Sequence, residues 1–471
     1  MSESMVNVST PMATSVESEP EMPPGVDSAE AGVKTGGLDL PGISRREFLA
    51  ASGVLAASVA ARKLVTPRRS FSPSAIAGGK GSIAILDDDT NTVFKNGGIA
   101  DFERQTGIKV SAYEQISNAT LHDRLATMLE AHDDAFDVIM TWAAWAAEFG
   151  SAGWLEKLTQ SDLPADLLPV ALNCVSWGGR IYGFPKFGSI QTMFWDKTMF
   201  EQAGLDPEAY PTNYEEFLTA AEKCTAKGHY GYVADMGNSD DGYQNFVRWL
   251  LMCGGTMYDA KLNPIFNDSK GVQALTIMVD LMNVKKVMAP STITIAYSTD
   301  LATYFDDKKA AMQFNWPAAW TQGVGKGSEL TSKTMGNAII PGVNVRSASV
   351  DGSEGFAINR FSNNKDAALE WLKFVVSPPV QKRVALVDGW LPVSKTILSE
   401  PALQASNPVF ATYGKESHYQ VKRFGSPWYS PIATNISANV VGAMLKKMSP
   451  KAALDASASY ASSVIAQYRP Q

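Results

Sequence analysis

Short apolar runs alternate with amphipathic segments along the chain from residue 82 onwards. The apolar runs have the length of buried β-strands, and they lie at residues 82–86, 108–113 and 136–140. Between them, residues 93–105 and 121–131 carry apolar side chains at helical spacing, and Gly107 stands where a helix C-cap is expected. This order of strands and helices predicts an α/β fold with a mostly parallel sheet that is covered by helices.

Polar residues follow the first and the third predicted strands. Asp87–Thr90 come after the first strand, and Thr141–Trp142 come after the third. The carboxyl ends of parallel strands meet at the same edge of a sheet, and ligands bind beyond that edge. We therefore expect both segments to lie on one rim.

Length, composition and charge narrow the class of protein. The chain has 471 residues, of which 45% are hydrophobic and 19% are charged, as in a globular protein. This length exceeds that of an ordinary single domain, so we expect two lobes. The formal net charge of −7 argues against nucleic-acid binding. The charge is uneven, because residues 1–43 are acidic, which predicts a disordered leader, whereas residues 44–77 are basic.

The basic segment has the pattern of an export signal. Arg45-Arg46 is a twin-arginine pair, and residues 48–61 form a stretch too short to span a bilayer. Ala75-Ile76-Ala77 is a small-x-small cleavage pattern. We predict export by the twin-arginine machinery to the periplasm or the extracellular space, with a mature chain that begins at Gly78. The sequence leaves open whether the signal is cleaved or is kept as a membrane tether.

The sequence lacks the common motifs of catalysis and metal binding. It contains no C-x-x-C, H-E-x-x-H, G-x-S-x-G or P-loop pattern. Cys174, Cys224 and Cys253 allow at most one disulfide within the chain. His122 and His132 stand among acidic residues on a predicted helix, which favours a solvated helix face. We therefore expect no cofactor, no metal site and no enzymatic activity.

Nine segments follow one another in the order of a known family. They include F-E-x-x-T-G-I-x-V and Y-G-x-P patterns, and they lie at residues 102–110, 136–155, 180–185, 195–205, 215–217, 309–320, 355–358, 367–374 and 389–393. Over nearly all of residues 80–471, the chain resembles an extracellular solute-binding protein of a bacterial ABC importer. This group includes the maltose-binding proteins.

The resemblance implies a two-lobed, type II periplasmic-binding-protein-like fold, in which hinge-connected lobes close on a ligand cleft. The N-terminal lobe would comprise residues 78–187 and 350–402, and the C-terminal lobe residues 188–349 and 403–471. The protein would then be a monomer that binds a carbohydrate and delivers it to the transmembrane subunits of an ABC permease.

Tryptophans at the ends of elements are candidate ligand contacts, because an aromatic ring packs well on the apolar face of a sugar. These tryptophans are Trp142, Trp316, Trp320, Trp390 and Trp428. Trp154, Trp249 and Trp371 lie within apolar runs, so we assign them to the core. By position, the resemblance adds Asp89, Thr90, Thr141, Phe187, Tyr243 and Asn245.

Two alternatives to a sugar receptor remain open at this point. A polyamine receptor would need several carboxylates, which Asp87–Asp89 and Asp240-Asp241 could supply. Twin-arginine export is also used by secreted enzymes. Ala143 and Ala144 stand where the family often has a charged or amide residue, so the resemblance does not imply a maltodextrin ligand.

Overall fold

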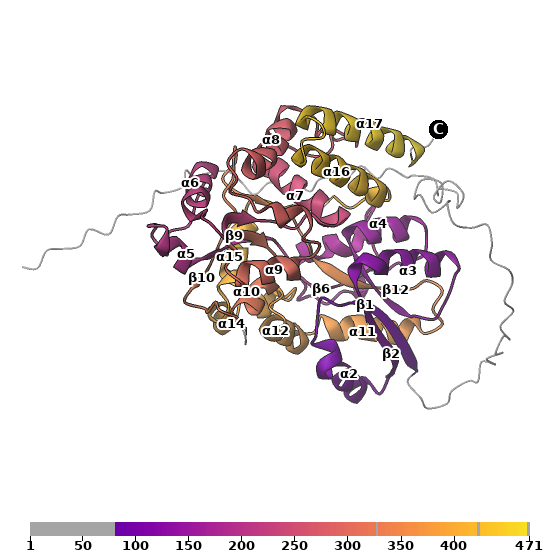
Figure 1. Cartoon of the computed structure of the whole chain (residues 1–471). Coiled ribbons are helices and arrows are strands. Elements are labelled where there is room, and N and C mark those ends of the chain that lie inside the picture. Colours follow the sequence, from indigo (N-terminus) through magenta and orange to yellow (C-terminus); the bar gives the residue numbers. More distant parts are fainter. Residues whose placement is uncertain (1–80, 326–327, 422–423, 469–471) are drawn as a thin grey trace, which may run out of the picture. The chain divides into compact units, whose positions relative to one another are not determined.

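The computed structural model describes residues 81–325, 328–421 and 424–468. The predicted acidic leader, residues 1–43, and the predicted export signal, residues 44–77, lie outside the described residues. Two larger β-sheets and the helices around them make up most of the described chain (Figure 1).

The first sheet has five strands in the order β2-β1-β3-β12-β6. Their bounds are β1 Ser82–Asp88, β2 Lys109–Ile116, β3 Val138–Trp142, β6 Gly183–Phe187 and β12 Glu354–Ile358. The pairs β1–β2 and β1–β3 are parallel, as predicted. β12 runs antiparallel to β3 and β6, so the sheet is mixed rather than mostly parallel. The first residue of β12, Glu354, pairs with the last residue of β3, Trp142. From there β12 runs back along β3 in the opposite direction.

Helices pack on this sheet and bury its apolar side chains. They are η2 Phe94–Gly98, α2 Ile99–Thr106, α3 Asn118–Glu130, α4 Ala143–Ser151, α11 Lys365–Val375 and α12 Pro378–Val387. The ring centroid of the fully buried Trp371 lies 5.1 Å from that of Phe102. The helix predicted from residue 93 is interrupted at Gly97, whose φ of 104° is left-handed, so the regular helix begins at Ile99. Gly107 ends it with a φ of 75°, as predicted.

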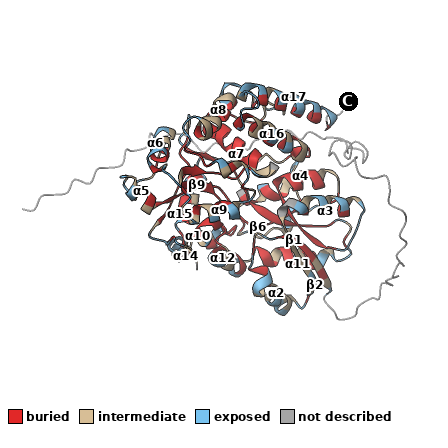
Figure 2. Ribbon diagram, viewed as in Figure 1, coloured by how far each residue is buried: buried red, intermediate tan, exposed pale blue. Residues whose placement is uncertain are grey.

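The second sheet has four strands in the order β10-β7-β9-β8, and β8 is parallel to β9. The strands are β7 Thr192–Asp196, β8 Tyr230–Val233, β9 Ala310–Asn315 and β10 Met335–Ala338. The helices that follow these strands or pack beside them are α5 Lys197–Gln202, α6 Tyr214–Cys224, α7 Ser239–Met252, α8 Ser269–Asn283, α9 Ser298–Asp306, α10 Ala318–Gly323, α15 Pro408–Glu416, α16 Tyr429–Met444 and α17 Pro450–Tyr468. Among these helices, α7, α8, α16 and α17 pack together (Figure 1). Apart from β2, none of whose residues is buried, the strands of both sheets are largely buried (Figure 2).

The remaining elements are short. They are η3 Gln160–Asp162, η4 Pro169–Val175, β4 Ser176–Trp177, β5 Arg180–Ile181, η5 Pro290–Ile293, β11 Ala348–Ser349, α13 Lys395–Leu398, α14 Pro401–Ser406 and β13 Gln420–Val421. Cys174, Cys224 and Cys253 are buried free thiols, so none of them forms a disulfide. Trp154, Trp249 and Trp371 are buried, as predicted for core residues.

Two extended segments join the sheets and pair with each other. Residues 188–191 connect β6 to β7, and residues 350–353 lead into β12. The backbone N–H of Gly352 donates to the carbonyl of Ser189 at 2.8 Å. The predicted lobe boundaries after residues 187 and 349 fall at the starts of these segments, and the boundary after residue 402 falls within α14. These boundaries remain predictions.

Candidate functional site

A fully buried lysine links three strands at one edge of the first sheet. The Nζ atom of Lys186, in β6, lies 2.9 Å from Oδ1 of Asp87 and 2.6 Å from Oδ1 of Asp88, at the end of β1. The same Nζ lies 3.0 Å from Oε2 of Glu354, the first residue of β12. One cation therefore faces three carboxyl groups in a region that water does not reach.

Burial and charge shift the pKa values of this cluster in different directions. Burial raises the pKa of Glu354 well above its ordinary value, and the neighbouring Asp88 raises it further. Burial also raises the pKa of Asp87. Burial opposes ionisation of Asp88, but the charge of Lys186 holds the pKa of Asp88 below its ordinary value. Burial therefore favours the neutral form of Glu354, while the charge of Lys186 favours the ionised form of Asp88.

Thr90 connects the charged cluster to two stacked rings. Its hydroxyl donates to Oδ1 of Asp88 at 2.7 Å, and its carbonyl accepts from Nε1 of Trp390 at 2.8 Å. The ring of Trp390 stacks on that of Phe187, with centroids 4.3 Å apart and planes only 5° from parallel. Three residues predicted to bind ligand, Thr90, Phe187 and Trp390, thus lie together, although they are far apart in the sequence.

A second group of rings begins at the end of β3. Trp142 contacts Tyr429 edge to face, with centroids 5.0 Å apart, and Tyr429 contacts Tyr243 in the same manner at 5.1 Å. Tyr429 is the first residue of α16 and Tyr243 belongs to α7, so the rings join the first sheet to helices beside the second sheet, and we call that sheet with its helices the second lobe. The hydroxyl of Tyr429 donates to Oδ1 of Asp240 at 2.5 Å.

Helix α7, which carries Tyr243, also contributes Asn245 and Arg248 to a buried polar network. Nδ2 of Asn245 donates to Oδ1 of Asp235 at 3.0 Å, and Nη2 of Arg248 donates to Oδ1 of Asn245. Nη1 of Arg248 donates to Oε1 of Gln191, in the segment that connects the sheets, at 2.5 Å. Burial raises the pKa of Asp235 to about 6, against the opposing effects of Asn245 and Arg248. Within the described residues, the buried Nε of Arg248 and Oγ of Ser189 have no hydrogen-bond partner.

The other predicted contacts at this edge differ in their surroundings. Asp89 is exposed, and Thr141 is buried with its hydroxyl 3.5 Å from the carbonyl of Trp142, which is too long for a strong hydrogen bond. Trp316 follows β9, and its half-buried ring lies against Gly352 in the returning segment. An added Cβ on Gly352 would come within 2.4 Å of that ring, so this position requires glycine.

Two further predicted tryptophans are buried in apolar clusters. Trp320, in α10, is buried in an apolar cluster with Phe194 and Phe305. Trp428 is buried, with its ring centroid 5.6 Å from that of Tyr468. Their roles in ligand binding remain predictions, which the packing of Trp320 does not favour.

The sequence-based list lacks several central residues. It omits Lys186, Gln191, Asp235, Arg248, Glu354 and Tyr429. Lys186 and Arg248 each stand as a lone charge within an apolar run, and this unusual pattern is the signal that could have revealed both.

His122 is not on a solvated helix face, and that prediction is wrong for this residue. Its Nε2 lies 3.1 Å from Oε2 of the buried Glu148, and its ring stacks on Phe149. Burial lowers the pKa of His122, but Glu148 outweighs this effect and raises it to about 9. Ser430, in α16, also donates to Glu148 at 3.3 Å, so the pair connects α3, α4 and α16.

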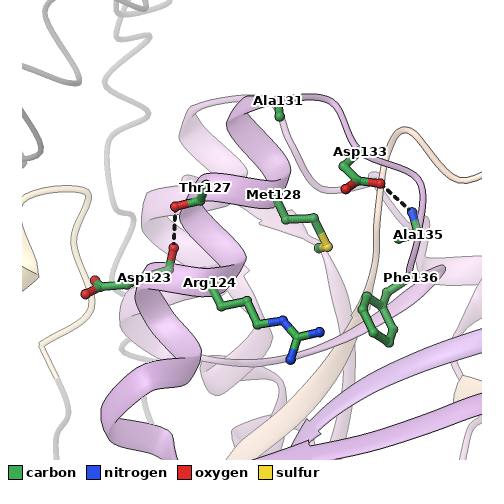
Figure 3. A pocket seen from close by; sticks show the side chains of 8 residues that line it. All are labelled: Asp123, Arg124, Thr127, Met128, Ala131, Asp133, Ala135 and Phe136. Carbon is green, nitrogen blue, oxygen red and sulfur yellow. Dashed lines mark hydrogen bonds between the residues drawn. The ribbon is translucent and has the colours of Figure 1, made fainter. Parts of the chain in front are cut away.

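An open pocket of about 550 Å³ lies elsewhere, beside α3 and the loop that leads to β3 (Figure 3). It is lined by Asp123, Arg124, Thr127, Met128, Ala131, Asp133, Ala135 and Phe136. Arg124 pairs with Glu114 and lies over the ring of Phe136, so its charge is already balanced. The pocket contains no predicted ligand residue.

Comparison with known proteins identifies the class to which this fold and site belong. The family model of bacterial extracellular solute-binding proteins matches residues 88–382, and the chain belongs to this family. The resemblance inferred from the sequence is therefore confirmed.

Individual relatives differ in what their names say they bind. A probable amino-acid ABC transporter periplasmic-binding protein of Sinorhizobium fredii is 25% identical over 65% of this chain and 71% of its own length. The mannitol-binding protein of Pseudomonas aeruginosa is 27% identical over 57% of this chain and 62% of its own. Among solved structures, maltose-bound MalE3 of T. maritima has a TM-score of 0.75 at 25% identity, covering 81% of this chain and 99% of that one. The predicted two-lobed fold is thereby confirmed.

In residues 81–325, 328–421 and 424–468, no helix combines the length and the apolar character that crossing a bilayer requires.

The Glu354→Gln variant tests the charge balance around Lys186. Because folding raises the pKa of Glu354 above 4.5, the folded protein keeps a proton that the unfolded chain releases as the pH rises. As the pH rises above 4.5, the contribution of Glu354 to the free energy of unfolding therefore falls. The free energy of unfolding, measured with denaturant, should fall less steeply with rising pH in the variant than in the wild type. Glu370→Gln, on the exposed side of α11, should keep the wild-type slope, and equal slopes in all three proteins would contradict the assignment.

Proposed function

We propose that the protein is a receptor that binds a carbohydrate or a polyol at the edge of the first sheet and delivers it to an ABC permease. The observation that carries this proposal is the run of rings formed by Trp142, Tyr429 and Tyr243, together with the buried hydrogen-bonding groups of Asn245 and Arg248 in the same helix, α7, as Tyr243. Rings match the apolar faces of a sugar or polyol, and amide and guanidinium groups match its hydroxyls. The mannitol-binding and maltose-bound relatives support this class of ligand.

Ligand entry requires movement, since the proposed contacts are buried. Trp142 is 4% exposed and Tyr429 is 5% exposed, so a solute reaches them when the lobes separate. We place this hinge motion at residues 188–191 and 350–353, the paired segments that join the two sheets. Closure then buries the ligand between Trp142 and the helices α7 and α16.

A polyamine is a weaker candidate, because four of the five acidic residues it would need already have partners, and the fifth is the exposed Asp89. Asp87 and Asp88 bind Lys186. Asp240 accepts from Tyr429 and from Gln244, and Asp241 accepts from Asn238. Asp89 supplies only one carboxylate, so a polyamine would have to displace these groups before its other ammonium ions met a carboxylate. A neutral polyhydroxyl ligand needs no such displacement.

We further propose that the protein acts without turnover and as a monomer, and that its transport partner is an ABC permease. Its relatives are named as binding proteins, which supports a receptor over an exported enzyme. Export by the twin-arginine machinery is supported by Arg45-Arg46 and Ala75-Ile76-Ala77 in the sequence. The expected site of action is the periplasm or the cell exterior.

A thermal-shift screen tests the class of ligand. Ligands that bind only the folded state add about 2.7 kcal/mol of stability at one hundred times Kd, so a true ligand raises Tm clearly. We expect a response to a sugar or a sugar alcohol, and none to putrescine or spermidine. A response confined to the polyamines would refute the carbohydrate proposal, and chemical conversion of the bound solute, followed by chromatography, would refute the receptor proposal.

Single substitutions test the proposed rings. Trp142→Ala and Tyr429→Ala should each weaken binding of the responding ligand by about 1–3 kcal/mol, measured by calorimetry, because each ring loses its contact with an apolar ligand face. Trp154→Ala is the matched control, since it removes a buried ring from the core, and should lower Tm without changing affinity. Unchanged affinity in both site variants would show that the rings are structural.

N-terminal sequencing of the exported protein tests the signal. We expect a chain that begins at Gly78 and a loss of export in the variant Arg45→Lys/Arg46→Lys. Export of that variant at the wild-type level would contradict the twin-arginine assignment.

A further inference from the structure

Two neighbouring turns of the second lobe form a surface that the proposed ligand site does not use. Residues 284–286 follow α8, and residues 445–448 follow α16. Asn283 ties the two turns together, because its Nδ2 donates to the carbonyl of Met444 at 2.8 Å and to that of Val279 at 3.1 Å. We call this surface the lysine tip, and it consists of Val284, Lys285, Lys286, Leu445, Lys446, Lys447 and Met448.

The lysine tip exposes apolar side chains to solvent. Val284 is 66% exposed, Leu445 is 41% exposed and Met448 is 37% exposed. Both turns are fixed by backbone hydrogen bonds, such as that from Lys447 N–H to the carbonyl of Gly442 at 2.9 Å. Lys446 adopts a left-handed φ of 60°, which bends the chain sharply after α16. The apolar side chains are therefore held outward on tight turns.

The lysine tip is also basic, although the whole chain carries a net charge of −7. Lys285 pairs with Glu222 at 2.8 Å. Among the described residues, Lys286, Lys446 and Lys447 take part in no ion pair. The two turns of the lysine tip thus carry three lysines without an ion pair and three exposed apolar side chains.

We infer that the lysine tip docks on the surface of an anionic membrane. Lysine ammonium groups attract acidic lipid head groups, while apolar side chains enter the boundary between head groups and acyl chains. The tip has both kinds of group on convex turns. An acidic protein partner fits less well, because a stable protein interface takes about 20–30 residues from each side, far more than the tip supplies.

Docking through the lysine tip leaves the proposed ligand site free. The tip follows the C-terminal end of α16, whereas Tyr429 begins that helix. Sixteen helical residues separate these ends by about 24 Å. The surface would therefore hold the receptor close to the membrane that carries its permease, without blocking exchange of the solute.

Vesicle sedimentation of the full chain tests this inference with a charge-matched control. The tip variant is Lys286→Glu/Lys446→Glu/Lys447→Glu. The control variant, Lys157→Glu/Lys333→Glu/Lys415→Glu, changes the same number of exposed lysines elsewhere. On phosphatidylglycerol vesicles, the tip variant should bind at least about tenfold more weakly than the control, and on phosphatidylcholine vesicles the two should not differ. An equal loss in both variants, or no loss in either, would overturn the inference and would leave an acidic protein as the partner to seek.

Amide hydrogen exchange of the wild-type chain separates the tip from the predicted export signal, which could itself bind lipid. On phosphatidylglycerol vesicles, we expect protection at residues 284–286 and 445–448. Protection confined to residues 44–77 would overturn the inference. The ligand-induced Tm shift of the tip variant should equal that of the wild type, so failure of the docking proposal is distinguishable from failure of the proposed receptor function.

Discussion

The ion pair between Lys186 and Asp88 is the interaction on which the edge of the first sheet depends. A fully buried ammonium group is strongly disfavoured unless anions and hydrogen bonds replace its water, and here Asp87, Asp88 and Glu354 do so. Because these side chains come from β1, β6 and β12, the requirement to neutralise one lysine fixes the ends of three strands relative to one another.

This constraint extends to the connection between the lobes. Lys186 lies just before the segment that leaves the first sheet, and Glu354 lies just after the segment that returns to it. The same cluster orders Thr90, whose carbonyl holds the indole of Trp390 against Phe187. Opening of the lobes can therefore bend residues 188–191 and 350–353 while the charged cluster keeps the rim of the first sheet intact.

The proposed ligand contacts come from both lobes. The first sheet supplies the ring of Trp142, while the second lobe supplies Tyr243 and Tyr429 together with the network around Arg248. Much of the charge on both sides is already paired, which favours a neutral solute with many hydroxyl groups. His122 and Glu148 add a further contact between α3, α4 and α16, and so couple the first lobe to the helix that carries Tyr429.

The sequence by itself determined the fold class, the parallel start of the first sheet, the helix end at Gly107 and the meeting of Asp87–Thr90 with Trp142 at one rim. These features follow from local patterns of burial and from the topology of parallel strands. Only the tertiary structure decided that β12 inserts antiparallel, that Trp390 stacks on Phe187 and that Trp320 packs in an apolar cluster. It alone also brought Lys186 to Asp87, which is 99 residues away in the chain. Local patterns show which side chains are buried, but contacts between distant segments depend on how the whole chain closes, because each buried charge must find its partner in three dimensions.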